Sequence, residues 1–140
     1  MTIVGFNFLE MHVTRTEGAA GKINISNNVA IKDISERDLT LGSDKQSGLK
    51  FTFEFVSKYE PKVGEIKLIG DVSYIGDSKE VKKILEEWKK SKKINKEIMT
   101  SILNTVLQKC NIKALILSQD VNLPPCLPLP KVQVDNPSEN

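Results

Sequence analysis

Few side chains in this sequence are of the types that make or break bonds, and their spacing fits no catalytic arrangement. The sequence holds one histidine, His12, and two cysteines, Cys110 and Cys126. A Ser-His-Asp or Cys-His site would depend on one imidazole in a predicted strand, and neither thiol lies in a nucleophile motif. Structural zinc needs four such ligands. We therefore expect no catalytic residue, no metal and no cofactor.

Carboxylates and glycines add no chemistry to this picture. Glu86 and Glu87 are neighbours on a predicted exposed helix, and Asp33, Glu36 and Asp38 lie in a polar stretch, where solvated charges are the simpler interpretation. The glycines do not fall in a Walker-type or GxGxxG spacing. The sequence predicts a protein that is not an enzyme.

Lysines are concentrated in one part of the chain. Residues 77–113 carry ten lysines and five acidic residues, a net +5, while the whole chain has a net charge of +2. The densest cluster consists of Lys89, Lys90, Lys92 and Lys93. Such a cluster suits RNA phosphates, but a solvated lysine-rich helix end is commoner and complements the helix dipole. Contact of these lysines with RNA or the ribosome is the alternative function.

The first half of the chain predicts strands. Residues 49–55 alternate apolar and polar side chains and place Phe51, Phe53 and Phe55 on one face. After a turn at residues 61–64, the alternation of residues 66–74 predicts an antiparallel return strand. Aromatic rows on a sheet also stack bases in some RNA-binding domains. A core role is the simpler prediction here, because no RNP-like run accompanies the row.

The remaining strands have weaker patterns. Alternation over residues 4–13 changes phase after Phe8, which predicts a bulge. Residues 23–31 predict a weak strand interrupted at Ser26, Asn27 and Asn28, and residues 42–48 predict a polar loop. Gly70 lies in mid-strand on the apolar face, which predicts a bulge there or the close approach of a helix.

The second half of the chain has helical periodicity. Asp77 and Glu80 have capping-box spacing ahead of Val81, Ile84, Leu85 and Trp88, which share one helix face. Asn95 can cap a second helix whose apolar stripe runs from Ile98 to about Leu117. Strands before helices predict an α+β domain over residues 1–132, with residues 133–140 as a flexible polar tail.

A stiff apolar segment follows the helices. Four of the eight residues in 123–130 are proline, which excludes helix and central strand and favours an extended path. The residues between the prolines include Leu123, Leu127 and Leu129, unlike the Ser and Gly of a flexible linker. Two interpretations stay open: the segment seals the core of its own chain, or it offers a surface to a partner.

Surplus apolar positions predict self-association. Val56, Ile69 and Ile75 lie on the sheet face opposite the main core, and the second helix is apolar over much of its circumference. A symmetric dimer or tetramer would cover such surface; a two-sided core would do so as well. No stretch resembles a signal peptide or approaches the ~20 apolar residues of a membrane span, so we expect a cytoplasmic protein without membrane insertion.

The order of elements resembles the SecB family of export chaperones, and more closely the small SecB-like proteins of archaea. The segments that carry the resemblance are residues 51–55, 59–61, 63–70, 104–116 and 123–130. The resemblance covers most of residues 22–132. It implies a four-stranded antiparallel sheet backed by two helices, assembled into a dimer or tetramer. Its grooves would hold unfolded or nascent polypeptide, without cofactors, as a holdase that can be linked to protein export.

The resemblance supplies no invariant binding motif, so the candidate client-binding residues come from this sequence. They are Trp88, expected in the loop between the helices, Tyr59 and Tyr74 near strand ends, and Leu127 and Leu129 in the proline segment. For each of them a core role is the open alternative. The chain is slightly basic, whereas bacterial SecB proteins are acidic, and this difference leaves room for RNA or ribosome association.

Overall fold

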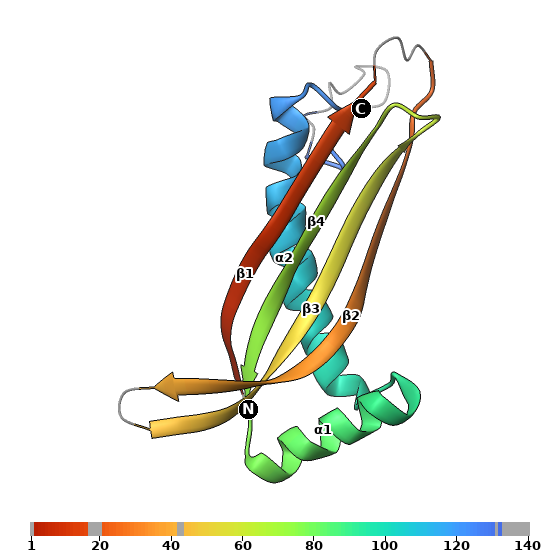
Figure 1. Cartoon of the computed structure of the whole chain (residues 1–140). Helices are drawn as coiled ribbons and strands as arrows, with labels where there is room; N and C mark the ends of the chain where they lie inside the picture. Colours follow the sequence, from red (N-terminus) through yellow and green to blue (C-terminus); the bar gives the residue numbers. More distant parts are fainter. Residues whose placement is uncertain (1, 17–20, 42–43, 131, 133–140) are drawn as a thin grey trace, which may run out of the picture.

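One antiparallel sheet carries both helices on the same side. The structure, a computed structural model, describes residues 2–16, 21–41, 44–130 and 132. Its elements are β1 (Thr2–Arg15), β2 (Asn24–Leu41), β3 (Asp44–Glu60), β4 (Gly64–Ile75), α1 (Ser78–Ser91) and α2 (Lys96–Asp120). The strand order is β1-β4-β3-β2, with α2 running along the sheet and α1 at one end of it (Figure 1). The predicted four-stranded α+β fold is confirmed; residues 133–140 lie outside the described residues.

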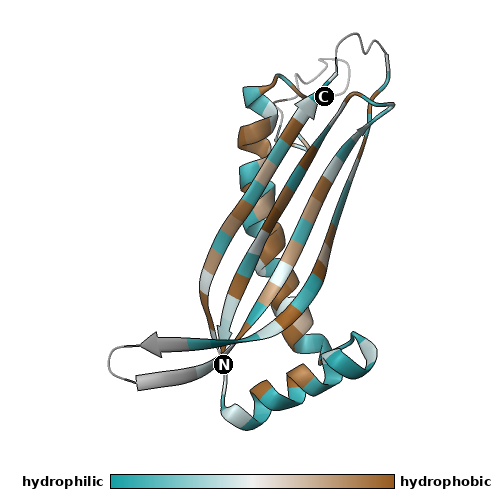
Figure 2. Cartoon of the chain, viewed as in Figure 1, coloured by the Kyte–Doolittle hydropathy of each residue, from teal (hydrophilic) through white to brown (hydrophobic). Residues whose placement is uncertain are grey.

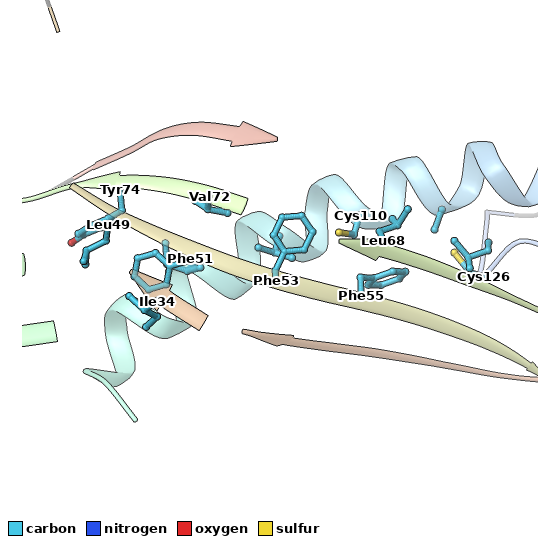
Figure 3. Close-up of a cluster of buried hydrophobic side chains, with 14 of the residues drawn as sticks. Ile34, Leu49, Phe51, Phe53, Phe55, Leu68, Val72, Tyr74, Cys110 and Cys126 are labelled. Atoms are coloured by element: carbon cyan, nitrogen blue, oxygen red, sulfur yellow. The ribbon is translucent and has the colours of Figure 1, made fainter. Parts of the chain in front are cut away.

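The core forms between the helix-facing side of the sheet and α2. Phe51, Phe53 and Phe55 of β3 have no exposed surface, and they point with their neighbours into a single apolar layer (Figure 3). On α2 the buried residues recur every four positions: Ile102, Val106, Cys110, Ala114 and Ser118. The alternation predicted for β3 therefore serves the core, and its phenylalanines are not available to stack bases.

Position 70 needs a glycine because the neighbouring strand β1 and the Phe53 ring, not a helix, come too close for a side chain. A Cβ atom at Gly70 would lie 2.1 Å from the Asn7 carbonyl oxygen and 2.7 Å from the Phe53 ring. The predicted helix approach is wrong, and the bulge is in the neighbouring strand: the β1–β4 register shifts between Phe8 and Glu10. That bulge, which the phase change after Phe8 predicted, leaves Leu9 unpaired, and a second one leaves Val4 unpaired.

The β2–β3 hairpin is longer than the sequence pattern indicated. β2 is continuous through Ser26, Asn27 and Asn28, because backbone pairing with residues 56–58 needs no apolar side chains on an exposed edge. The predicted loop at 42–48 is wrong for residues 44–48, which pair with residues 37–41, while residues 42–43 lie outside the described residues. The hairpin curves across the end of the sheet beyond the other strands (Figure 1). Hydrophobic alternation could not predict pairing that extends past the core.

Both helices begin at the predicted caps. The Asp77 carboxylate accepts a hydrogen bond from the Glu80 amide (2.9 Å), and the Asn95 side chain accepts from the Glu97 amide (2.8 Å). α2 continues past the expected end at Leu117. It closes with a Schellman motif, in which the Leu123 amide donates to the Ser118 carbonyl (2.8 Å) and Asn122 has a left-handed φ of 58°. This turn sends the proline segment back toward the sheet.

The contact at Gly70 gives a stability prediction. We expect Gly70→Ala to lower the free energy of unfolding by about 2 kcal/mol or more, because the added methyl group displaces β1 backbone and the Phe53 ring. Gly5→Ala is the matched control, since its Cβ would meet only the Ser73 side chain at 3.5 Å, and it should change stability by less than about 0.5 kcal/mol. Urea unfolding measures both; equal effects would contradict this description of the β1–β4 contact.

Candidate functional site

Residues 123–130, here called the proline strap, cross the end of the sheet and cover the core. The side chains of Leu123 and Cys126 are each only 5% exposed. The Tyr59 hydroxyl donates a hydrogen bond to the Pro124 carbonyl oxygen (2.6 Å), and the Asn27 side-chain amide donates to the Cys126 carbonyl oxygen (2.9 Å). One face of the strap therefore closes the core, as the first interpretation of this segment predicted.

Burial raises the pKa values of two groups at the contact between the strap and the sheet. It raises the pKa of the Tyr59 hydroxyl to about 12, with a smaller contribution from the nearby Cys126 thiol. Burial also raises the pKa of the Cys126 thiol. The Tyr59 hydroxyl therefore keeps its proton, and with it the bond to the strap, to a higher pH than an exposed tyrosine would.

The other face of the strap borders an apolar groove. Leu129 is 45% exposed, and Leu127 is half-buried against the core. Together with the C-terminal half of α2 the strap forms an open groove of about 340 Å³, here called the α2–strap groove. It is lined by Ile112, Leu115, Ile116, Ser118, Gln119, Pro125 and Leu129. The segment is thus both a cover for the core and part of an exposed apolar surface.

The outward row of α2 changes character along its length. Thr100, Asn104 and Gln108 near its beginning are polar, whereas Ile112 and Ile116 are apolar and are 56% and 48% exposed. Apolar and polar segments alternate along the whole of α2 (Figure 2), so the change concerns this outward row alone. Exposed apolar surface on this helix is therefore concentrated beside the strap. Sequence reasoning missed these two isoleucines, although their spacing of four on the face opposite the buried row was a usable signal.

The predicted aromatic binding residues lie in the core. Tyr59, Tyr74 and Trp88 are 1%, 5% and 6% exposed. Trp88 lies in the last turn of α1, so its expected place in the loop between the helices is wrong: its position in the 3.6-residue period faces it inward with Ile84. Of the candidate client-binding residues, the structure places only Leu129 in the groove and Leu127 close to it along the strap.

The four clustered lysines are exposed at the end of α1, away from the strap (Figure 1). Lys92 has a left-handed φ of 57°, and its amide donates to the Trp88 carbonyl oxygen (2.9 Å). Its ammonium lies 5.1 Å from the centre of the Trp88 ring. Lys92 thus has a structural role, while Lys89, Lys90 and Lys93 extend from a helix end that has no exposed aromatic beside it.

The uncovered face of the sheet is mainly polar. At its centre Asp71, 3% exposed, forms an ion pair with Arg37 (3.2 Å), and Arg37 also donates to the Ser73 hydroxyl (2.7 Å). Val56, Ile69 and Ile75 are half-buried among such residues. Apolar side chains are more exposed on the edge strand β1 than on this face: Val4, Leu9 and Met11 are 42%, 62% and 50% exposed.

Groups that could support catalysis are dispersed. Within the described ranges, no three His, Cys, Asp or Glu side chains are grouped as metal ligands. His12 is exposed on β1, and the two thiols are buried. None of the helices that the structure describes is long and apolar enough to cross a bilayer. The most distinctive surface of the described chain is therefore the apolar α2–strap groove.

Comparison with known proteins identifies the fold. No protein-family model matches the sequence, and no curated protein is similar to it in sequence. Among solved structures, the chain is similar to a SecB-like chaperone of Mycobacterium tuberculosis, solved in complex with a ChAD peptide from the HigA1 antitoxin. The TM-score is 0.55 at 9% sequence identity, and the match covers 96% of this chain and 92% of that chain. The likeness shows a SecB-like fold.

Two leucines of the strap give a matched prediction. We expect Leu123→Ala to lower the free energy of unfolding by about 2–3 kcal/mol, because it opens a cavity in the core. Leu129→Ala should change it by clearly less, about 1 kcal/mol or below, because that side chain is 45% exposed and its removal opens no cavity in the core. Chemical denaturation distinguishes the two. Similar losses from both substitutions would mean that the strap does not have one buried and one exposed face.

Proposed function

We propose that this protein is a holdase-type chaperone that binds unfolded polypeptide in the α2–strap groove and performs no chemistry. The observation that carries the proposal is the cluster of exposed Ile112, Ile116 and Leu129 on a SecB-like fold. Exposed apolar side chains around a groove favour binding of apolar segments of other chains. The similar mycobacterial chaperone was solved with a bound peptide, which supports the same class of ligand here.

The groove is shallow, so affinity requires more than one copy. Covering apolar surface contributes roughly 25 cal/mol per Å², and a groove of about 340 Å³ holds only a few side chains. Linked sites on one oligomer bind a long unfolded chain far more tightly than any single site does. A dimer or tetramer is accordingly part of the proposal.

The edge strand β1 offers a surface for that assembly. It pairs with β4 on one side only, and an open edge with unpaired backbone groups is a ready partner for another strand. Its exposed Leu9 and Met11 would be covered by the β1 strand of a second copy in a two-fold arrangement. This would remove the largest exposed apolar side chains on the sheet.

We propose further that the protein acts in the cytoplasm, can serve protein export and is related to the archaeal SecB-like proteins that its sequence resembles. Unfolded or nascent chains are the proposed clients. Among the described residues, the lysine-rich end of α1 has no exposed aromatic side chain beside it, because Trp88 is buried, and this disfavours base stacking there.

Client binding should depend on the groove isoleucines. We expect the double substitution of Ile112 and Ile116 by asparagine to weaken binding of a fluorescent unfolded peptide about tenfold, the equivalent of about 1.4 kcal/mol. Gln108→Asn, on the same outward row, is the matched control and should bind as the unsubstituted protein does. Fluorescence anisotropy measures the affinity, and suppression of the aggregation of an unfolding protein should follow it.

Salt separates this function from the RNA alternative. Apolar burial is weakly screened, so client affinity should change little with salt and should survive replacement of the four clustered lysines by glutamine. An RNA contact would weaken steeply as salt rises. Tight, salt-sensitive RNA binding together with no effect on an aggregating client would contradict the proposed function.

Assembly gives a separate prediction. We expect sedimentation velocity to show a dimer or tetramer at micromolar concentration. Substituting Leu9 and Met11 together by lysine should shift it toward monomer, because apolar contacts are lost and charges repel across the two-fold axis. His12→Lys adds charge to the same strand without removing an apolar side chain and should have a smaller effect. A monomeric unsubstituted protein would contradict the assembly.

A further inference from the structure

The proline strap is held on the sheet in the way that a bound peptide would be. Residues 123–126 have an irregular path, and both side-chain hydrogen bonds to them reach backbone carbonyl oxygens, those of Pro124 and Cys126. Any polypeptide offers such acceptors. The one large side chain seated there is Leu123, which lies against Gly64: a Cβ on Gly64 would be 3.1 Å from a Leu123 methyl group.

The surface beneath the strap is more polar than core sealing requires. The Tyr59 hydroxyl is neighboured by the hydroxyls of Ser57 and Ser118. Ser57 is wholly buried, and apart from the neighbouring Tyr59 hydroxyl its Oγ has no hydrogen-bond partner. The strap cannot supply a backbone donor from Pro124 or Pro125, because proline has no N–H. A chain with ordinary residues at these places could donate to Ser57, so the strap leaves its own site incompletely satisfied.

The strap can leave this site without unfolding the helix that precedes it. Of the Schellman turn, only the bond from the Leu123 amide to the Ser118 carbonyl oxygen (2.8 Å) belongs to the strap. The bond from the Asn122 amide to the Gln119 carbonyl oxygen (3.2 Å) and the one from Arg15 to the Val121 carbonyl oxygen (3.1 Å) lie ahead of it. Beyond that point, Tyr59 and Asn27 supply the described side-chain hydrogen bonds to the strap. The exchange would therefore replace two side-chain hydrogen bonds, the Leu123 amide bond and the burial of Leu123 and Cys126.

The site beneath the strap adjoins the exposed groove. Pro125 and Leu129 line the α2–strap groove, while Leu123 and Cys126 of the same segment are turned into the core. A polypeptide lying in the groove is therefore separated from the buried site only by the strap. Opening the strap would join both surfaces into one longer apolar site.

We propose that the proline strap is a displaceable internal ligand, and that the site it covers accepts an extended, leucine-containing segment of an unfolded polypeptide. Tyr59 and Asn27 would then donate to the carbonyl oxygens of that segment, and its N–H groups would supply the donor that Ser57 lacks. The identification of the incoming ligand as unfolded polypeptide rests on the proposed function. With the strap closed, the apparent affinity is reduced by the fraction of molecules in which the site is open.

Cys126 reports on strap opening in the full-length protein. We would measure the rates of N-ethylmaleimide addition at Cys126 and Cys110 in the same sample by mass spectrometry. Cys110 lies in the core layer with no exposed surface, and burial raises its thiol pKa to about 12, so its labelling reports global unfolding. Tyr59→Phe removes the hydroxyl and keeps the ring. It should speed Cys126 labelling about fivefold, the effect of one net hydrogen bond, while Cys110 labelling stays far slower than that of Cys126.

Asn27→Ala, at an exposed position, provides a second variant should the tyrosine substitution disturb folding. Unchanged Cys126 labelling in both variants would overturn the displaceable strap. Saturation with a leucine-rich unfolded peptide should also speed Cys126 labelling at least fivefold. Tyr59→Phe should leave the affinity for that peptide nearly unchanged, because the same hydroxyl donates to the strap in the closed state and to the peptide in the open state.

Peptide binding with Cys126 labelling unchanged or slowed would overturn the displacement while leaving the proposed function intact. Failure of every variant to bind peptide in the anisotropy assay would overturn the proposed function and, with it, the exchange with polypeptide.

Discussion

Packing of α2 onto the phenylalanine face of β3 determines what the rest of the molecule can do. The buried residues of α2 from Ile102 to Ser118 are four positions apart, so they form one row along the helix, and this row faces the core. The opposite row is necessarily turned outward, and its C-terminal half is apolar. Since the Schellman turn at Asn122 returns the chain to the sheet beside this half, core packing and the exposed groove are two sides of one arrangement.

Much of this arrangement could be predicted from local patterns. Alternation in β3, the caps at Asp77 and Asn95 and the phase change after Phe8 each depend on neighbouring residues, and each prediction was confirmed. The continuity of β2 was missed because backbone pairing on an exposed edge leaves no hydrophobic signal. The groove was missed because its lining combines residues from α2 and the strap, whose contact depends on the tertiary fold.

The candidate aromatic residues show a second limit of sequence reasoning. An aromatic ring suits a binding groove and a core equally well, and only its depth distinguishes the two roles. Tyr59, Tyr74 and Trp88 proved to be buried, whereas the exposed apolar surface is provided by aliphatic side chains, Ile112, Ile116 and Leu129. This exposed aliphatic surface is the feature on which the proposed holdase function depends.

The central claim is that unfolded polypeptide contacts the α2–strap groove. Photo-cross-linking tests it most directly: an unfolded peptide carrying a benzophenone group is irradiated with the full-length protein, and the attachment sites are mapped by mass spectrometry. The account predicts attachment to Ile112, Leu115, Ile116 and Leu129. Attachment mainly to the polar face around Asp71 or to the lysine-rich end of α1 would contradict it.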